Sequence, residues 1–134
     1  MSEWNDKVIE ELRANGGTAP SMGGMPLLIL RATGARSGQP RETPILYRER
    51  GDDLVVFASY AGAPTHPAWY HNLVAHPEVT VEVGGERRAV RARVAGRAER
   101  DELYDWNKQD FESFAEYEEK TDRTIPVVVL EPVA

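Results

Sequence analysis

The stretch LVVFASYAGAPTHPAWYHN, residues 54–72, joins an apolar run to an aromatic cluster through a loop of small residues. The run at 54–58 predicts a buried strand, and the Gly/Pro composition of 59–65 predicts a loop. Thr65 followed by Pro67 predicts an N-cap and the first turn of a helix over about 67–75. Such a loop frees backbone N–H groups and lets a planar ligand approach the main chain. A tight connection around a core tryptophan is the alternative interpretation.

Length and composition are those of an ordinary globular domain. The 134 residues suffice for one core, and 41% are hydrophobic and 28% charged. No apolar run approaches the roughly 20 residues of a membrane span and no signal peptide opens the chain, so we expect a cytoplasmic protein. Cysteine is absent, and His66, His71 and His76 lack a metal-ligand spacing, so we expect no metal site.

Charge is unevenly distributed along the sequence. The net charge of −6 disfavours nucleic acid as a partner. Residues 31–50 nevertheless hold five arginines against two glutamates, a local charge of +3, whereas residues 99–122 carry −7. A basic segment inside an acidic protein favours a small anionic ligand over a polyanion, because field lines focus locally while the whole molecule repels.

The chain opens with one amphipathic helix. Residues 3–13 place Trp4 and three aliphatic side chains at near-helical spacing, with Ser2 as a candidate cap and Gly16-Gly17 as the terminator. We therefore expect an N-terminal helical segment over 1–17 and a second unit over 18–134. The helix either docks on the domain, lines a pocket or touches a membrane surface.

Extended periodicity dominates the rest of the chain. Strands are predicted at 27–30, 42–48, 54–58, 79–83 and 124–131, with a further strand that follows the Gly84-Gly85 hairpin and includes 90–94. Residues 98–120 have the composition of a helix. Six strands with mostly hairpin connections predict a mainly β protein with α: a small antiparallel barrel with covering helices, because closure hides the sheet edges.

Four blocks carry a resemblance to a known family. TGARSGQPR at 33–41, ASYAGA at 58–63, HPAWYHNL at 66–73 and TDRTIPVV at 121–128 resemble, in the same order, the deazaflavin-dependent nitroreductases, in particular the quinone-reductase-like branch. The resemblance implies a split β-barrel of the FMN-binding type that binds reduced coenzyme F420. It also implies hydride transfer to quinones, nitro compounds or other activated double bonds. Reduction of membrane-associated quinones is the activity commonly suggested for relatives. The resemblance therefore also implies that the protein associates peripherally with the inner face of the cell membrane.

The resemblance also implies roles for individual residues. Ser59 and Tyr117 are the expected catalytic residues. Two guanidinium forks, those of Arg36 and Arg41, suit a phosphodiester and a carboxylate tail. The full cofactor set is Arg36, Ser37, Arg41, Thr43, Ala58, Ser59, Tyr60, Ala61, Gly62, Pro67, Ala68 and Trp69. The expected substrate pocket contains Trp4, Tyr47, Phe111, Phe114 and Tyr117.

Two departures from the family pattern bear on the substrate. Tyr60 stands where many relatives carry lysine, and Phe111 and Phe114 stand where well-known members carry tyrosine. The pocket should therefore be more apolar, with fewer donors for a nitro group. No dinucleotide fingerprint occurs, so we expect no use of NADH or NADPH. An FMN- or haem-binding barrel, or a deazaflavin carrier without turnover, is the alternative, and both monomer and homodimer stay open.

Overall fold

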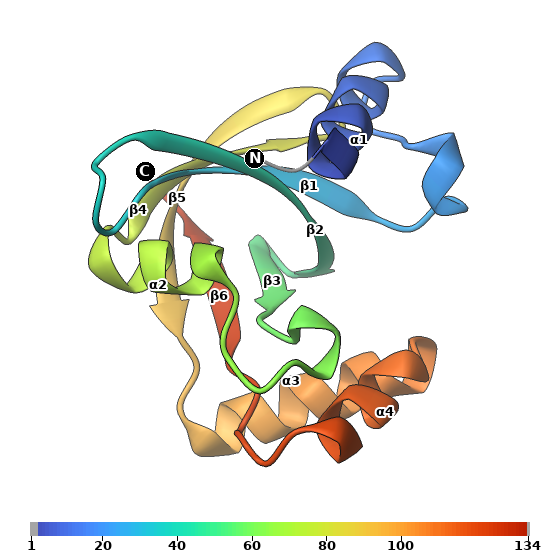
Figure 1. The fold of residues 1–134 in the computed structure, drawn as a ribbon, viewed down its shortest axis with the longest axis vertical. Helices are drawn as coiled ribbons and strands as arrows, with labels where there is room; N and C mark the ends of the chain where they lie inside the picture. The colour runs from blue at the N-terminus through green and yellow to red at the C-terminus, as the bar shows by residue number, and fades with distance from the viewer. Residues whose placement is uncertain (1–2, 134) are drawn as a thin grey trace.

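Six antiparallel strands close into a barrel in the order β1-β2-β3-β6-β5-β4 (Figure 1). The computed structural model describes residues 3–133, without the side chain of Glu3. The strands are β1 (Leu27–Thr33), β2 (Pro40–Arg50), β3 (Asp53–Phe57), β4 (Glu78–Val83), β5 (Glu86–Val94) and β6 (Val127–Pro132). Pairing of β1 with β4 closes the barrel. The architecture confirms the expected barrel with covering helices.

The long apolar runs of β3 and β6 are explained by burial on both faces. Strand residues alternate between faces, so Val56 and Val128 point into the barrel and join its core. Val55 and Val129, one step along, face outward and are buried under helices instead. By contrast, β4 alternates buried with half-buried positions because one of its faces meets solvent.

Helix α1 (Glu3–Ala14) covers β1 from outside. Val8, Ile9 and Leu12 pack against the outward Leu27 and Ile29. The expected docking of the helix on the domain is thus observed, and the proposed Ser2 cap lies outside the described residues. Figure 1 places α1 at one end of the molecule and the two C-terminal helices at the other.

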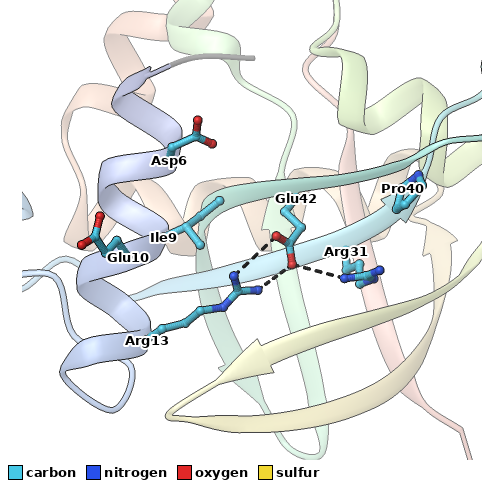
Figure 2. A pocket seen from close by; sticks show the side chains of 7 residues that line it. All are labelled: Asp6, Ile9, Glu10, Arg13, Arg31, Pro40 and Glu42. Carbon is cyan, nitrogen blue, oxygen red and sulfur yellow. Dashed lines mark hydrogen bonds and ion pairs between the residues drawn. The ribbon is translucent and has the colours of Figure 1, made fainter.

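An ion-pair cluster fixes the end of α1 to the barrel. Arg13 reaches Glu42 of β2 at 2.5 Å and Glu82 of β4 at 2.6 Å. Arg31 contacts the same Glu42 at 3.5 Å, as Figure 2 shows. Asp6 and Glu10 line the neighbouring hollow on the helix side (Figure 2). The helix is therefore held by apolar packing and by a charge clamp that spans two strands.

Two expectations about helices were wrong. The predicted helix over 98–120 is broken into α3 (Arg97–Asp110) and α4 (Ser113–Lys120), because Phe111 leaves helical geometry at φ −133° and ψ 87°. Its ring instead packs 6.3 Å from that of Phe114, within the cluster under β3 and β6. The break allows α4 to turn back toward the barrel.

The second error concerns the start of α2 (Ala68–Ala75). Its N-cap is Pro67, at φ −68° and ψ 154°, and no side chain caps it, so the expected capping role of Thr65 was wrong. The physical reason is that the extended Pro67 itself supplies the first helical acceptor, its carbonyl oxygen, to the Tyr70 amide at 3.1 Å. Across residues 3–133, no helix has the length and apolar character to cross a membrane.

Candidate cofactor and substrate site

A groove of about 550 Å³ runs between the β1–β2 turn and the start of α2. This volume lies in the usual range for small-molecule sites. The structure brings six of the expected cofactor residues together on its walls. The lining residues are Gly34, Ala35, Arg36, Ser37, Arg41, Thr43, Ala68, Trp69, His71 and Asn72.

The positive charge of the basic segment is concentrated at this groove. Three of its five arginines are neutralised elsewhere: Arg31 by Glu42, Arg48 by Asp110 at 2.6 Å, and Arg50 by Glu102 at 2.7 Å. Within residues 3–133, Arg36 and Arg41 form no ion pair with a carboxylate. Arg41 instead donates to the Ser37 hydroxyl at 3.3 Å. Two guanidinium groups are thus left for an anionic ligand.

Asn72 of α2 holds the basic turn in place. Its Oδ1 accepts a hydrogen bond from the Ala35 amide at 2.9 Å, and the side chain is only 9% exposed. The turn is also closed by the Gly34 amide, which donates to the Gln39 carbonyl at 2.8 Å. Sequence reasoning missed Asn72 because its partner lies 37 residues away and no local pattern announces the contact.

The loop from β3 to α2 carries a second group of expected cofactor residues in an unusual conformation. Tyr60 and Ala61 have φ of 46° and 52°, a left-handed geometry that costs roughly 1 kcal/mol or more per non-glycine residue. Gly62 follows at φ 80°, and a Cβ there would lie 3.0 Å from the Tyr117 carbonyl. Such strain persists only where the surroundings hold it, and it is concentrated at functional sites.

Ser59 stands at the start of this loop and is half-buried. Its hydroxyl makes no hydrogen bond within the described part of the chain, so that it is free for a ligand. The Ser59 carbonyl, in contrast, accepts from Arg123 at 2.8 Å. Arg123 also bonds to Ala58, Ala63 and His66, and was absent from the residues expected at the site. The signal in the sequence that could have identified Arg123 is its position in the TDRTIPVV block.

The expected substrate residues divide between the two ends of the molecule. Phe111, Phe114 and Tyr117 lie together, with the Phe114 and Tyr117 rings 5.2 Å apart. Phe114 is 7% exposed and contacts the core ring of Phe57, whereas Phe111 and Tyr117 are half-buried. Trp4 is 54% exposed and belongs to α1, which lies at the end of the molecule opposite to α3 and α4 (Figure 1).

Tyr47, the remaining expected substrate residue, is not among the residues that line the groove. It is half-buried on β2, beside Val56 of β3, and packs against the barrel core. Burial raises the pKa of its phenol above the ordinary value, with a further contribution from Glu49. Its hydroxyl is therefore protonated at neutral pH and can act as a hydrogen-bond donor.

Taken together, the groove and the loop fit an elongated, partly planar and anionic group. Trp69 and Ala68 offer apolar surface, the strained loop offers main chain without bulk, and the two unpaired arginines stand at the turn. Within residues 3–133, no cluster of three or more histidine, aspartate or glutamate side chains is arranged to hold a metal ion.

The fold and the groove define a split β-barrel of the FMN-binding type. A pyridoxamine 5′-phosphate oxidase-related, FMN binding protein from Nostoc punctiforme has the same fold, with a TM-score of 0.57 at 13% identity, over 99% of this chain and 82% of that one. At this identity the likeness concerns the fold alone.

Comparison of the sequence assigns the family. The model of the F420H(2)-dependent quinone reductase family matches residues 4–132. An F420H(2)-dependent quinone reductase of Mycobacterium tuberculosis (strain H37Rv) is 40% identical over 111 residues, covering 81% of this chain and 74% of that protein. The chain therefore belongs to the F420H(2)-dependent quinone reductase family. It is an oxidoreductase whose cofactor is reduced coenzyme F420, as the four sequence blocks indicated.

Solved structures agree with this assignment. An F420-H2 dependent reductase, FDR-A, has a TM-score of 0.72 at 36% identity, over 79% of this chain and 94% of that one. A second structure, described as a domain-swapped dimer, has a TM-score of 0.73 at 32% identity, over 94% of this chain and 95% of that one.

Proposed function

We propose that this protein transfers a hydride from reduced F420 to a quinone, a nitro compound or another activated double bond. The observation that carries the proposal is the pair of arginines, Arg36 and Arg41, which have no carboxylate partner within residues 3–133 and line a groove at the start of α2, the helix that follows the strained loop. Reduced F420, when bound, supplies the hydride, and the protein supplies position and electrostatics. No covalent nucleophile is needed.

The groove and the loop divide the work of binding. Arg36 and Arg41, with Ser37 and Thr43, hold the phosphate and the carboxylate tail by charged hydrogen bonds. The residues from Ala58 to Gly62, together with Pro67, Ala68 and Trp69, form the wall along the deazaflavin ring. Asn72 keeps the two parts in register, because it connects α2 to the basic turn.

The catalytic roles fall to Ser59 and Tyr117. The Ser59 hydroxyl has no partner within the described chain and can donate to the cofactor or the acceptor. Tyr117 lies on α4, which packs on the loop at Gly62, and its phenol can donate a proton to a substrate oxygen. Phe111 and Tyr47 complete an apolar pocket that favours quinones over nitroimidazole-type acceptors. Phe114 supports this pocket from the core, and Trp4 can join it only if α1 moves.

Binding separates the proposed function from the FMN- or haem-binding alternative. Purified protein is titrated with F420, FMN and haem, and fluorescence and absorbance are followed. We expect saturable binding of F420 and weaker or absent binding of the other two, because neither has a long anionic tail for both arginines. Tighter binding of FMN or haem would overturn the proposal.

We propose in addition a weak association with the inner face of the membrane. The support for this proposal is the ring of Trp4, which is exposed. The aliphatic side chains of α1, by contrast, are packed on the barrel and are not available to a membrane. An exposed tryptophan suits a membrane interface. Vesicle sedimentation of the wild type and Trp4→Ser tests this idea: equal pelleting of both proteins, or none of either, would contradict it.

A homodimer is proposed over a monomer because one solved relative is described as a domain-swapped dimer. Multi-angle light scattering across a concentration series measures the mass directly. A mass of 15.0 kDa at every concentration would contradict the dimer.

A further inference from the structure

Arg123 closes a set of hydrogen bonds around the β3–α2 loop. Its Nε donates to the Ala63 carbonyl at 2.9 Å, and its Nη1 and Nη2 donate to the carbonyls of Ala58 and Ser59 at 3.1 and 2.8 Å. Nη1 also lies 2.8 Å from His66 Nδ1. One side chain from beyond α4 thus holds both ends of the strained loop.

The orientation of these carbonyls determines where the loop amides point. In a planar trans peptide the C=O and the following N–H point in opposite directions. The carbonyls of Ala58 and Ser59 face Arg123, so the amides of Ser59 and Tyr60 face away from it. Neither amide donates a hydrogen bond within residues 3–133. A buried or ligand-facing amide normally finds a hydrogen-bond partner, so both amides are suited to donate to an oxygen or nitrogen of a ligand.

Arg123 differs in its partners from Arg100, a buried arginine of α3. Arg100 is neutralised by Asp101 at 2.9 Å and by Glu118 at 3.0 Å. Among the described residues, Arg123 forms no ion pair, and all its acceptors are neutral. Burial without a counter-ion lowers its pKa below the ordinary arginine value. A purely structural tie does not need an uncompensated cation, which costs free energy.

We infer that Arg123 is the positioning residue of the cofactor site: it holds the loop so that the Ser59 and Tyr60 amides and the Ser59 hydroxyl are presented to the cofactor ring. This inference rests on the proposed F420 site. It assigns to Arg123 no contact with the cofactor, and it explains why the left-handed conformation at Tyr60 and Ala61 is maintained without glycine at either position.

His66 makes this arrangement sensitive to acid. Its Nδ1 must be unprotonated to accept from Arg123, and burial together with Arg123 and His71 lowers its pKa below the ordinary value. The groups that face it are Arg123, Tyr70 at 4.8 Å between ring centroids, and His71 at 5.9 Å. Protonation would place two cations together and remove one acceptor from Arg123. The lowered pKa keeps this event below neutral pH.

The test compares Arg123→Lys and Arg123→Ala with the wild type, with Arg100→Lys as the matched control. Arg100 also donates to a backbone carbonyl, that of Ile125 at 2.9 Å, but does not contact the loop. Two quantities are measured: amide hydrogen exchange of residues 58–66 in the cofactor-free protein, and the Kd for F420. Melting temperature is recorded for each variant.

We expect loop exchange to rise and the Kd to increase by about tenfold or more in both Arg123 variants, because several charged hydrogen bonds are lost together. Added guanidinium, well below denaturing concentrations, should restore part of the binding by Arg123→Ala. If that variant does not fold, Arg123→Lys carries the comparison. Arg100→Lys should lower the melting temperature while leaving loop exchange and Kd unchanged.

Two results separate the inference from the proposed function. The positioning role would be overturned if the Arg123 variants had the same loop exchange and the same Kd as the wild type and differed from it only by a lower melting temperature. Failure of the wild type to bind F420 would instead overturn the proposed function, and the exchange measurement on cofactor-free protein would then decide on its own whether Arg123 holds the loop.

Discussion

At the scale of single residues, Arg36 and Arg41 are expected to bind the anionic part of F420. A charged hydrogen bond contributes about 1.5–3 kcal/mol, so that Arg36→Ala or Arg41→Ala should weaken binding by roughly one to two powers of ten, at about 1.4 kcal/mol for each tenfold. The double variant should lose more, but not additively, since both groups contact one ligand. Fluorescence titration measures these Kd values.

Arg97→Ala is the control for the loss of one positive charge. The side chain of Arg97 is 75% exposed, and within residues 3–133 its one ion pair is with Asp101, one helical turn away, so Arg97→Ala should leave the Kd unchanged. Equal weakening by Arg97→Ala would point to a general loss of positive charge rather than to a built anion site.

Two phenylalanines close in sequence are expected to respond differently to an added hydroxyl. Phe114 is 7% exposed among the rings of Phe57 and Tyr104, so Phe114→Tyr should cost about 1–3 kcal/mol of unfolding free energy if the hydroxyl has no partner. Phe111 is half-buried, so Phe111→Tyr should fold normally and shift preference toward polar acceptors. Urea unfolding and kcat/KM ratios for two acceptors measure both effects. Identical behaviour of the two variants would contradict this division.

At the scale of elements, the clamp between α1 and the barrel should weaken in acid. Arg13 holds the pKa of the Glu82 carboxyl below its ordinary value near 4.5. A depressed carboxyl pKa contributes stability that is present above the unfolded value and lost as pH falls through the folded one. The unfolding free energies of the wild type and Arg13→Gln should therefore differ by a constant amount above about pH 4.5, and the difference should shrink below it.

The size of this effect is modest because the pairs are partly exposed; each contributes up to about 1 kcal/mol. Arg88→Gln serves as the control, since Arg88 approaches Glu86 only at 3.9 Å. A difference that stayed constant into acid, or one equal to that of the control, would show that apolar packing alone holds α1.

Elements also show where sequence reasoning succeeds and where it fails. The strands were predictable because alternation and apolar runs are local signals, and the doubly buried β3 gave a continuous run. The break in the helix at Phe111 was not predictable from the sequence, because no proline or glycine marks it. Its cause is the packing of the Phe111 ring against Phe114. The site divides in the same way: the basic turn was visible in the sequence, whereas the contacts of Arg123 cross about sixty residues.

At the scale of the whole molecule, local and overall charge act in opposite directions on an anionic cofactor. The net charge of −6 repels it, while the two unpaired arginines attract it at short range. Salt screens both, but the near attraction dominates at the site. Binding by the wild type should therefore weaken as salt is raised. The double variant Arg36→Ala, Arg41→Ala should show little salt dependence or even slightly better binding. If the Kd for F420 depended equally steeply on salt concentration in the wild type and in the double variant, the groove would not be the anion site.

The most direct test of the whole account is the choice of hydride donor. Purified protein is mixed with menadione and either reduced F420, NADH or NADPH, and oxidation of each donor is followed by absorbance against a protein-free control. We expect protein-dependent oxidation of reduced F420 and none of the nicotinamide donors, because the chain has no dinucleotide fingerprint and its groove suits an anionic deazaflavin. Comparable rates with NADPH, or saturable binding of F420 without any turnover, would contradict the proposed F420-dependent reductase activity.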